Sequence, residues 1–181
     1  YPNHYLILKG DRASALGFYN PITQRVERVE KRAISRIMPR NAEQVFALHA
    51  ITNPKVKLVT MQGVAGTGKT LLALAGALDQ KRNFKQIYLA RPIVPLSNKD
   101  IGYLPGAKQE KLSHWMQPIF DNLAYLLHNA EPQPTSRKRK SRVSVQSRIE
   151  RLLDDQTVCL EALTYIRGRS IPHQFFVVDE A

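Results

Sequence analysis

The chain has 181 residues, enough for one domain with a sizeable core, and 43% of them are hydrophobic. Lys and Arg number 27 against 15 Asp and Glu, so the net charge is +12 and a polyanion is the expected partner. No apolar stretch is long enough to span a bilayer, no signal-peptide pattern opens the chain, and the single Cys159 excludes an internal disulfide. The composition favours a cytoplasmic protein that meets nucleic acid and no membrane.

The first 36 residues predict a small β-rich appendage. Apolar runs at residues 4–8, 15–19 and 22–29 are separated by turn formers such as Asn20 and Pro21. Asn41 is a good N-cap for the helical pattern at residues 42–51, and Asn53 with Pro54 ends that helix. We therefore expect an appendage at residues 1–36 and a core at residues 37–181.

A glycine-rich loop at residues 63–70 (GVAGTGKT) fits G-x-x-x-x-G-K-[ST] at every fixed position. A strand-like run at residues 56–61 precedes it and a helix-like run at residues 71–78 follows it, as in phosphate-binding loops. Glycines let backbone N–H groups point at phosphates, and the following helix adds the positive end of its dipole. A chance glycine-rich turn is the alternative, and the flanking elements argue against it.

The loop predicts ATP and Mg²⁺ as ligands. Lys69 is expected on the β- and γ-phosphates, and the Thr70 hydroxyl on Mg²⁺. The full set of expected nucleotide-binding residues in the loop is Gly63, Val64, Ala65, Gly66, Thr67, Gly68, Lys69 and Thr70.

The rest of the chain predicts further strands and helices. Residues 86–90 and 157–160 read as strands, and residues 108–129 as a helix that Pro118 should kink or divide. The apolar run at residues 174–178 suits a strand covered on both faces, as in a parallel sheet. Alternating strands and helices favour an α/β fold with a mainly parallel sheet.

Two carboxylates follow the last strand. Asp179 is expected to hold the Mg²⁺ shell, and Glu180 to orient or deprotonate the attacking water. Acids commonly flank core strands, so this motif alone is weak evidence for a nucleotide site. The phosphate loop in the same chain makes the nucleotide interpretation the favoured one. Thr70 and Asp179 would both lie at the carboxyl ends of strands, where such sheets bind ligands.

A dense positive block lies in a linker-like stretch and is a candidate for contact with RNA phosphates. A solvated surface loop without a ligand is the alternative, and the basic bias of the whole chain favours nucleic acid. The block consists of Arg137, Lys138, Arg139, Lys140 and Arg142.

Taken together, these motifs resemble the PhoH-like ATPase family, within the RecA-like, helicase-related P-loop proteins. The matching stretches are residues 39–44, 63–70, 89–95, 102–106, 115–119 with Asp121, 165–169 and 178–181. The resemblance implies a RecA-like sheet with helices on both faces, ATP hydrolysis, RNA association and a homo-oligomeric ring, by resemblance a hexamer. Longer members carry a PIN ribonuclease domain, which is absent here, so no nuclease activity is expected. The family continues past the Asp-Glu-Ala motif, so we expect this chain to be truncated there.

The resemblance also assigns roles to single residues. Gln44 resembles the glutamine that reads the adenine edge in related helicases, although an exposed helix glutamine is the alternative. Arg91, Arg167 and Arg169 are candidates for nucleic-acid contact, or for structural ion pairs. Trp115 would stack on a base or belong to the core.

Two other functions stay open at this point. A nucleotide-dependent interaction module would bind ATP with little turnover, as expected of a chain without the later motifs. A small-molecule kinase shares the phosphate loop, but the basic charge and the pair of Asp179 and Glu180 weigh against it.

Overall fold

The computed structural model describes residues 1–92, 108–129 and 144–180, and for residues 108–115 and 129 it describes the backbone alone. The chain divides into two compact units, Tyr1–Asp79 and Gln80–Ala181. The motif residues 93–95 and 102–106, the Trp115 side chain and the positive block at residues 137–142 lie outside the described residues. The expected boundary after residue 36 stays a prediction. Within the described part of the chain, no helix combines the length and apolar character needed to cross a membrane.

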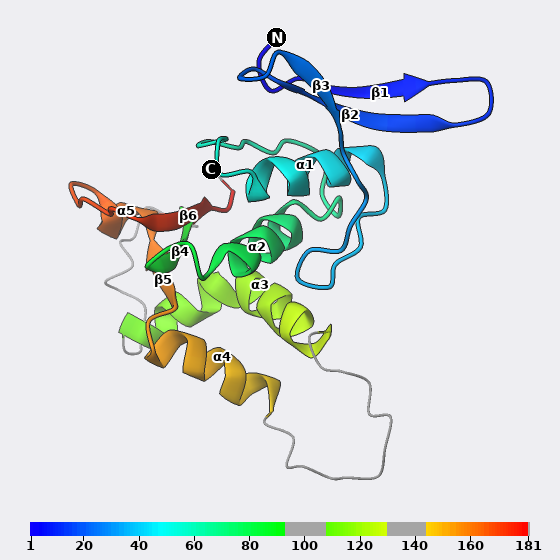
Figure 1. Cartoon of the computed structure of the whole chain (residues 1–181). Helices are drawn as coiled ribbons and strands as arrows, with labels where there is room; N and C mark the ends of the chain where they lie inside the picture. The colour runs from blue at the N-terminus through cyan, green and yellow to red at the C-terminus, as the bar shows by residue number, and fades with distance from the viewer. Residues whose placement is uncertain (93–107, 130–143, 181) are drawn as a thin grey trace, which may run out of the picture. The chain divides into compact units, whose positions relative to one another are not determined.

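The first unit opens with an antiparallel sheet of the three strands β1 (Tyr5–Lys9), β2 (Ser14–Asn20) and β3 (Arg25–Arg28), with β2 in the centre (Figure 1). All three apolar runs of the appendage thus contain a strand. The third strand begins later than the run at residues 22–29 suggests. The reason is a turn, in which Asn20 Oδ1 accepts hydrogen bonds from the backbone N–H groups of Ile22 and Thr23.

Helix α1 (Ala42–Thr52) follows and begins where the sequence predicts. The Asn41 side chain accepts a hydrogen bond from the Gln44 N–H at 2.9 Å, which satisfies a donor that the helix leaves unpaired. Phe18 and Val29 from the appendage form a buried cluster with Val45 of α1. The appendage strands therefore share a core with this helix.

Helix α2 (Lys69–Gln80) starts directly at the end of the glycine-rich loop. Five of its small and apolar residues are buried, namely Leu72, Leu74, Ala75, Gly76 and Ala77, and Leu74 is only 1% exposed. The prediction of a strand at residues 56–61 is wrong for this structure, because these residues form no strand and Leu58 is 82% exposed. An apolar run becomes a strand only where a neighbouring strand accepts its ladder hydrogen bonds, and none of the described residues does so here.

The second unit contains a parallel sheet in the order β5 (Val158–Ala162), β4 (Gln86–Arg91) and β6 (Gln174–Val178), shown side by side in Figure 1. The central strand β4 has Ile87, Leu89 and Ala90 almost completely buried. The parallel pairing confirms the α/β class. The arrangement with helices on both faces of a RecA-like sheet stays a prediction.

Strand β6 differs from the expectation of a strand covered on both faces. Phe176 at its centre is 39% exposed, while Val177 is buried. The reason is position, because β6 lies at the edge of the three-stranded sheet that the structure describes. An edge strand keeps one side without a neighbour, so less of its apolar surface is removed from water.

Three helices accompany this sheet: α3 (Lys108–Asn129), α4 (Val145–Asp154) and the short α5 (Leu163–Ile166). Pro118 lies inside α3, which continues through it, so the expected division does not occur. Met116, Ile119, Leu123 and Leu126 are buried along one helical face, and this packing offsets the local cost of the proline. Arg148 of α4 donates a hydrogen bond to the Leu127 carbonyl near the end of α3.

Candidate nucleotide-binding site

The glycine-rich loop has the backbone conformation that its glycines predict. Gly66 and Gly68 have φ angles of +79° and +87°, in the left-handed region that favours glycine. A Cβ added at Gly66 would meet open space, so the loop is not packed against other atoms there. The Thr67 hydroxyl donates to the Val64 carbonyl at 2.9 Å and closes the turn. The loop therefore forms a tight turn that continues directly into the first turn of α2.

Lys69 folds back over this loop. Its Nζ donates to the carbonyl oxygens of Gly63 at 2.8 Å and Val64 at 2.9 Å. The ammonium group thus lies against the backbone of the loop that the motif assigns to phosphates. An incoming phosphate would replace these two carbonyls with a charged acceptor, and hydrogen bonds to charged groups are the stronger ones.

Gln44 of α1 lies against the same loop. Its Nε2 donates to the Thr67 carbonyl at 3.1 Å, and its Oε1 accepts from the Arg40 N–H at 2.8 Å. The structure therefore brings Gln44 and the loop together, as the adenine-reading hypothesis requires. An amide has a second N–H and a second lone pair, so both contacts leave capacity for the edge of a base.

Asp179 and Glu180 follow β6 as predicted. The Asp179 N–H donates to the Ala90 carbonyl at 2.9 Å, which extends the parallel ladder past the strand. Glu180 is paired with Arg91 at the end of β4. A hydrogen bond from Arg91 holds the pKa of Glu180 below its ordinary value, so the carboxylate is ionised at neutral pH.

The sequence left an ion pair open for Arg91 but did not name Glu180 as its partner, although the signal for that partner was present. Arg91 and Glu180 each follow a strand-like run, and the carboxyl ends of parallel strands meet at one edge of a sheet.

Two further predicted site residues, Arg167 and Arg169, lie in the second unit. Arg169 donates to the Tyr88 hydroxyl at 3.1 Å and lies over the Tyr88 ring, while Arg167 is exposed. Thr70 belongs to the first unit and Asp179 to the second, so their joint role in holding Mg²⁺ stays a prediction. The nucleic-acid roles of the arginines likewise stay predictions.

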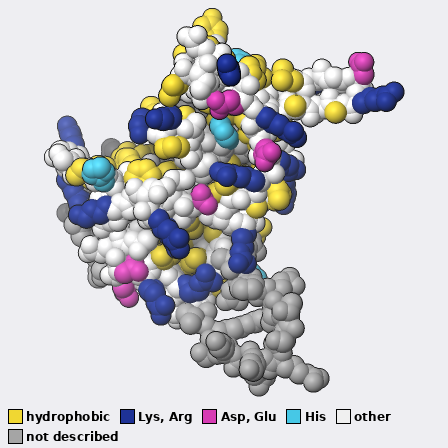
Figure 2. All heavy atoms as spheres, viewed as in Figure 1, with side chains coloured by type: hydrophobic (Ala, Val, Ile, Leu, Met, Phe, Trp, Pro, Cys, Tyr) yellow, Lys and Arg dark blue, Asp and Glu magenta, His cyan; other side chains and the backbone are white. Residues whose placement is uncertain are grey.

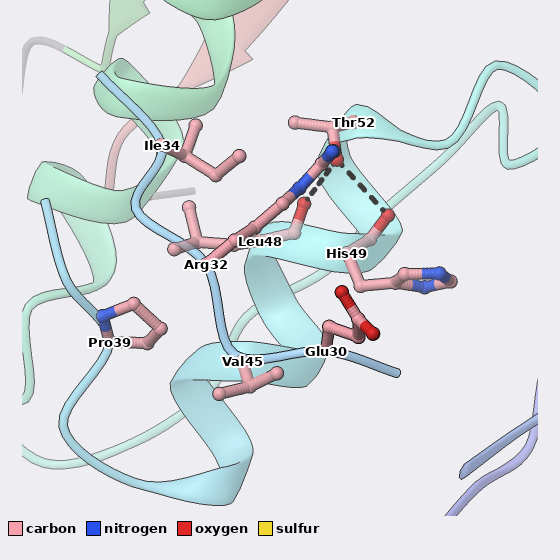
Figure 3. Close-up of a pocket in the computed structure, with 8 residues that line it drawn as sticks. All are labelled: Glu30, Arg32, Ile34, Pro39, Val45, Leu48, His49 and Thr52. Atoms are coloured by element: carbon pink, nitrogen blue, oxygen red, sulfur yellow. Dashed lines mark hydrogen bonds between the residues drawn. The ribbon is translucent and has the colours of Figure 1, made fainter. Parts of the chain in front are cut away.

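A small hollow lies beside α1 in the first unit, and Figure 3 shows the side chains around it. Val45, Leu48, His49 and Thr52 come from the helix, and Glu30, Arg32, Ile34 and Pro39 from the segment before it. Its volume is about 20 Å³, room for about one water molecule, so it is no site for a nucleotide.

Basic side chains are widely distributed on the surface. Figure 2 shows Lys and Arg over much of the face drawn, with fewer acidic side chains among them. This distribution follows from the net charge of +12 and suits attraction to polyanions in general.

The loop residues fit the phosphates of a nucleotide. Backbone N–H groups at the start of α2, the nearby Lys69 ammonium and the open space at Gly66 are the features that an anion requires. Thr70 offers a hydroxyl and Asp179 a carboxylate, which are oxygen ligands of the kind that Mg²⁺ takes.

Comparison with known proteins also indicates a nucleotide-binding protein of the P-loop type. The family model described as "PhoH-like protein" matches residues 36–181. The chain is similar to "Protein PhoH2" of Bacillus subtilis (strain 168), with 43% identity over 100% of this chain and 40% of the relative. "Protein PhoH2" of Thermobispora bispora is 33% identical over 97% of this chain and 37% of that protein. A "PhoH-like protein" of Bacillus subtilis (strain 168) is 31% identical over 66% of this chain.

The chain spans about two fifths of the length of the PhoH2 relatives that it matches. The family match nevertheless covers the helix α1 and the glycine-rich loop of the first unit, and the acidic motif after β6 in the second unit. The chain therefore belongs to the PhoH-like protein family, a family of P-loop ATPases.

Proposed function

We propose that this chain is the ATP-binding and ATP-hydrolysing core of a protein that couples nucleotide state to RNA binding or remodelling. The observation that carries the proposal is the loop of residues 63–70, with left-handed glycines, an inward Lys69 and α2 starting at its end. The single cysteine suits a reducing compartment, so we place this activity in the cytoplasm.

The proposed chemistry divides the work among few residues. Lys69 and the loop N–H groups offset the negative charge that builds up on the transferred phosphoryl group. Thr70 and Asp179 would hold Mg²⁺, which would supply charge stabilisation when it is bound. Glu180 orients the attacking water. Removing a group that stabilises transition-state charge commonly lowers the rate by about 10²–10³-fold.

Phosphate release by the natural protein, with and without RNA, tests this proposal. Glu180→Gln should retain Mg²⁺·ATP and lose turnover, because an amide is not a base, while Asp179→Ala should lose the Mg²⁺ dependence of binding. Equal loss of ATP binding in both variants would contradict the assigned roles. Wild-type binding without turnover in either condition would favour an interaction module instead.

RNA coupling needs its own measurement. We propose that the positive block at residues 137–142 contacts RNA phosphates. Replacing its five basic residues with Gln should then flatten the log–log salt dependence of RNA binding by about 2–3 units, since each neutralised phosphate of a single strand contributes about −0.7. ATP affinity should not change. Identical slopes would make the block a solvated loop and would favour Arg91, Arg167 and Arg169 as the RNA contacts.

Assembly is part of the same proposal. We propose a homo-oligomeric ring, with a hexamer as the expected size, and sedimentation of the natural protein with ATP measures it directly. A monomer at all protein concentrations would contradict this part alone.

A further inference from the structure

The ends of β4 and β6 lie next to each other in the second unit. Ala90 and Val178 are partners in the parallel register, and the Asp179 N–H continues the ladder by donating to the Ala90 carbonyl. The next residue on each strand is Arg91 and Glu180, respectively. The sheet itself therefore delivers these two side chains to the same place.

The contact between them is built around one oxygen. Arg91 Nε donates to Glu180 Oε2 at 3.1 Å, and Nη2 of the same guanidinium contacts that oxygen too. Two donors of one rigid guanidinium hold Oε2 in place, although contacts to a single oxygen leave the carboxylate able to pivot about it. With Oε2 held in this way, Oε1 is the oxygen available for orienting water.

The two partners are unequal in burial. The Arg91 side chain is 14% exposed, whereas the Glu180 side chain is 68% exposed. Arg91 is thus the anchored partner, and Glu180 has little packing of its own to restrict its rotamers. An exposed, long carboxylate side chain without such a contact would sample several conformations.

The backbone at Glu180 gives a second reason to expect an external contact. Its φ angle is +57°, in the left-handed region that residues other than glycine seldom adopt. Such a conformation costs about 1–3 kcal/mol and persists only where surrounding contacts hold it. The ion pair with Arg91 is a contact of this kind.

We propose that Arg91 is a positioning residue, which fixes the carboxylate of Glu180 for orienting the attacking water. This inference rests on the proposed ATPase function and adds a residue to it. The same ion pair also makes the carboxylate a weaker base, which by itself would lower the rate of hydrolysis. Positioning outweighs basicity here, because phosphoryl transfer through a loose transition state depends mainly on placement and charge stabilisation.

Steady-state hydrolysis by the natural protein with Mg²⁺, ATP and RNA tests the inference through Arg91→Gln. The kcat should fall by about ten- to a hundredfold, while KM and the calorimetric Kd for ATP stay unchanged. Normal ATP binding also shows that the variant is folded. Arg91→Lys keeps the charge but not the fork, so it should recover part of the lost kcat.

A double-mutant cycle separates this role from others. In a Glu180→Gln background, Arg91→Gln should not lower the slow residual single-turnover rate any further, because the carboxylate that it positions is already gone. Equal fractional losses in both backgrounds would overturn the inference and show that Arg91 acts elsewhere. An unchanged kcat in Arg91→Gln would also overturn it, and a raised kcat would make the pair a brake. If Arg91→Gln does not bind ATP, the test rests on Arg91→Lys. A wild-type kcat in Arg91→Lys would then overturn the inference.

The two levels of the account fail in different ways. An inactive wild-type protein refutes the proposed function, and the inference falls with it. An active wild type with an equally active Arg91→Gln refutes the inference only, and the ATPase function stands.

Discussion

Gln44 Nε2 donates a hydrogen bond to the Thr67 carbonyl across 3.1 Å, which joins α1 to the glycine-rich loop. The other end of the same amide accepts from the Arg40 N–H, in the segment that leads into the helix. A single side chain thus connects the predicted base-reading position to the predicted phosphate-binding backbone. We infer that the two parts of the nucleotide site are held in fixed relation within the first unit.

Replacing this amide should affect both parts. Gln44→Ala should narrow the preference for ATP over GTP, since a bidentate contact to a base is worth about 1–3 kcal/mol of discrimination. It should also lower the free energy of unfolding, because it removes the hydrogen bond to the loop and a net intramolecular hydrogen bond contributes about 0.5–1.5 kcal/mol. Calorimetric titration with ATP and GTP measures the first effect, and urea denaturation the second.

Glu43→Ala is the matched control for this variant, because Glu43 is its exposed neighbour on α1. The control should keep the ATP/GTP affinity ratio of the wild type. An unchanged ratio in Gln44→Ala as well would leave Gln44 with the loop contact and no role in reading the base.

Gly76 allows the close approach of α2 to Ile51 of α1. A Cβ added at Gly76 would overlap the Cγ2 of Ile51 and lie 3.2 Å from its Cβ. Alanine gains about 1 kcal/mol in helix propensity, but overpacking of this kind costs about 1–3 kcal/mol. We therefore expect Gly76→Ala to lower the free energy of unfolding by about 1 kcal/mol, as measured in urea.

The sign of this effect should reverse once the obstacle is removed. In an Ile51→Ala background the Cγ2 is absent, so Gly76→Ala should be neutral or stabilising through its helix propensity. Stabilisation by Gly76→Ala in both backgrounds would show that the overlap carries no cost.

His49 should make the stability of the first unit depend on pH. Its Nδ1 is hydrogen-bonded to the Tyr5 hydroxyl at 2.8 Å, and Glu30 and Arg32 line the hollow beside it (Figure 3). Burial lowers the pKa of His49 below its ordinary value of 6.5; Arg32 lowers it further and Glu27 raises it. Burial also raises the pKa of Tyr5 to about 12, so that hydroxyl stays protonated.

The direction of the dependence follows from proton binding. Just below pH 6.5 the unfolded chain binds a proton at His49 that the folded chain does not, so acidification favours unfolding. The contribution of His49 to the free energy of unfolding should therefore be complete above pH 6.5. It should decline as the pH falls below 6.5 toward the lowered pKa of His49 in the folded protein. Urea denaturation of wild type and His49→Gln between pH 5 and pH 8 measures the difference. Parallel pH curves for the two proteins would contradict this assignment.

Sequence reasoning located the elements whose signals are local. The N-cap at Asn41, the helix after the glycine-rich loop and the strand that ends at Arg91 depend on neighbouring residues, and all three are present. The left-handed glycines of the loop are local in the same sense. The position of the nucleotide site at this loop stays a prediction.

Features that depend on distant partners were not predicted. Residues 56–61 have the composition of a strand, but a strand also needs a neighbour, which sequence periodicity does not specify. Phe176 is partly exposed because β6 is an edge strand of the described sheet, and edge position is a property of the whole sheet. The pairing of Arg91 with Glu180 likewise depends on which two strands are adjacent. Pro118 stays inside α3 because tertiary packing outweighs its local preference.

The central claim is that the loop of residues 63–70 binds ATP through Lys69, and calorimetric titration with Mg²⁺·ATP tests it most directly. Lys69→Ala removes the ammonium group that lies on the Gly63 and Val64 carbonyls, while Lys57→Ala removes a lysine that donates to the Pro54 carbonyl outside this loop. A hydrogen bond to a charged group is worth about 1.5–3 kcal/mol, so Lys69→Ala should weaken ATP binding by about ten- to a hundredfold, and Lys57→Ala should leave it unchanged. Wild-type affinity for ATP in Lys69→Ala would contradict the account.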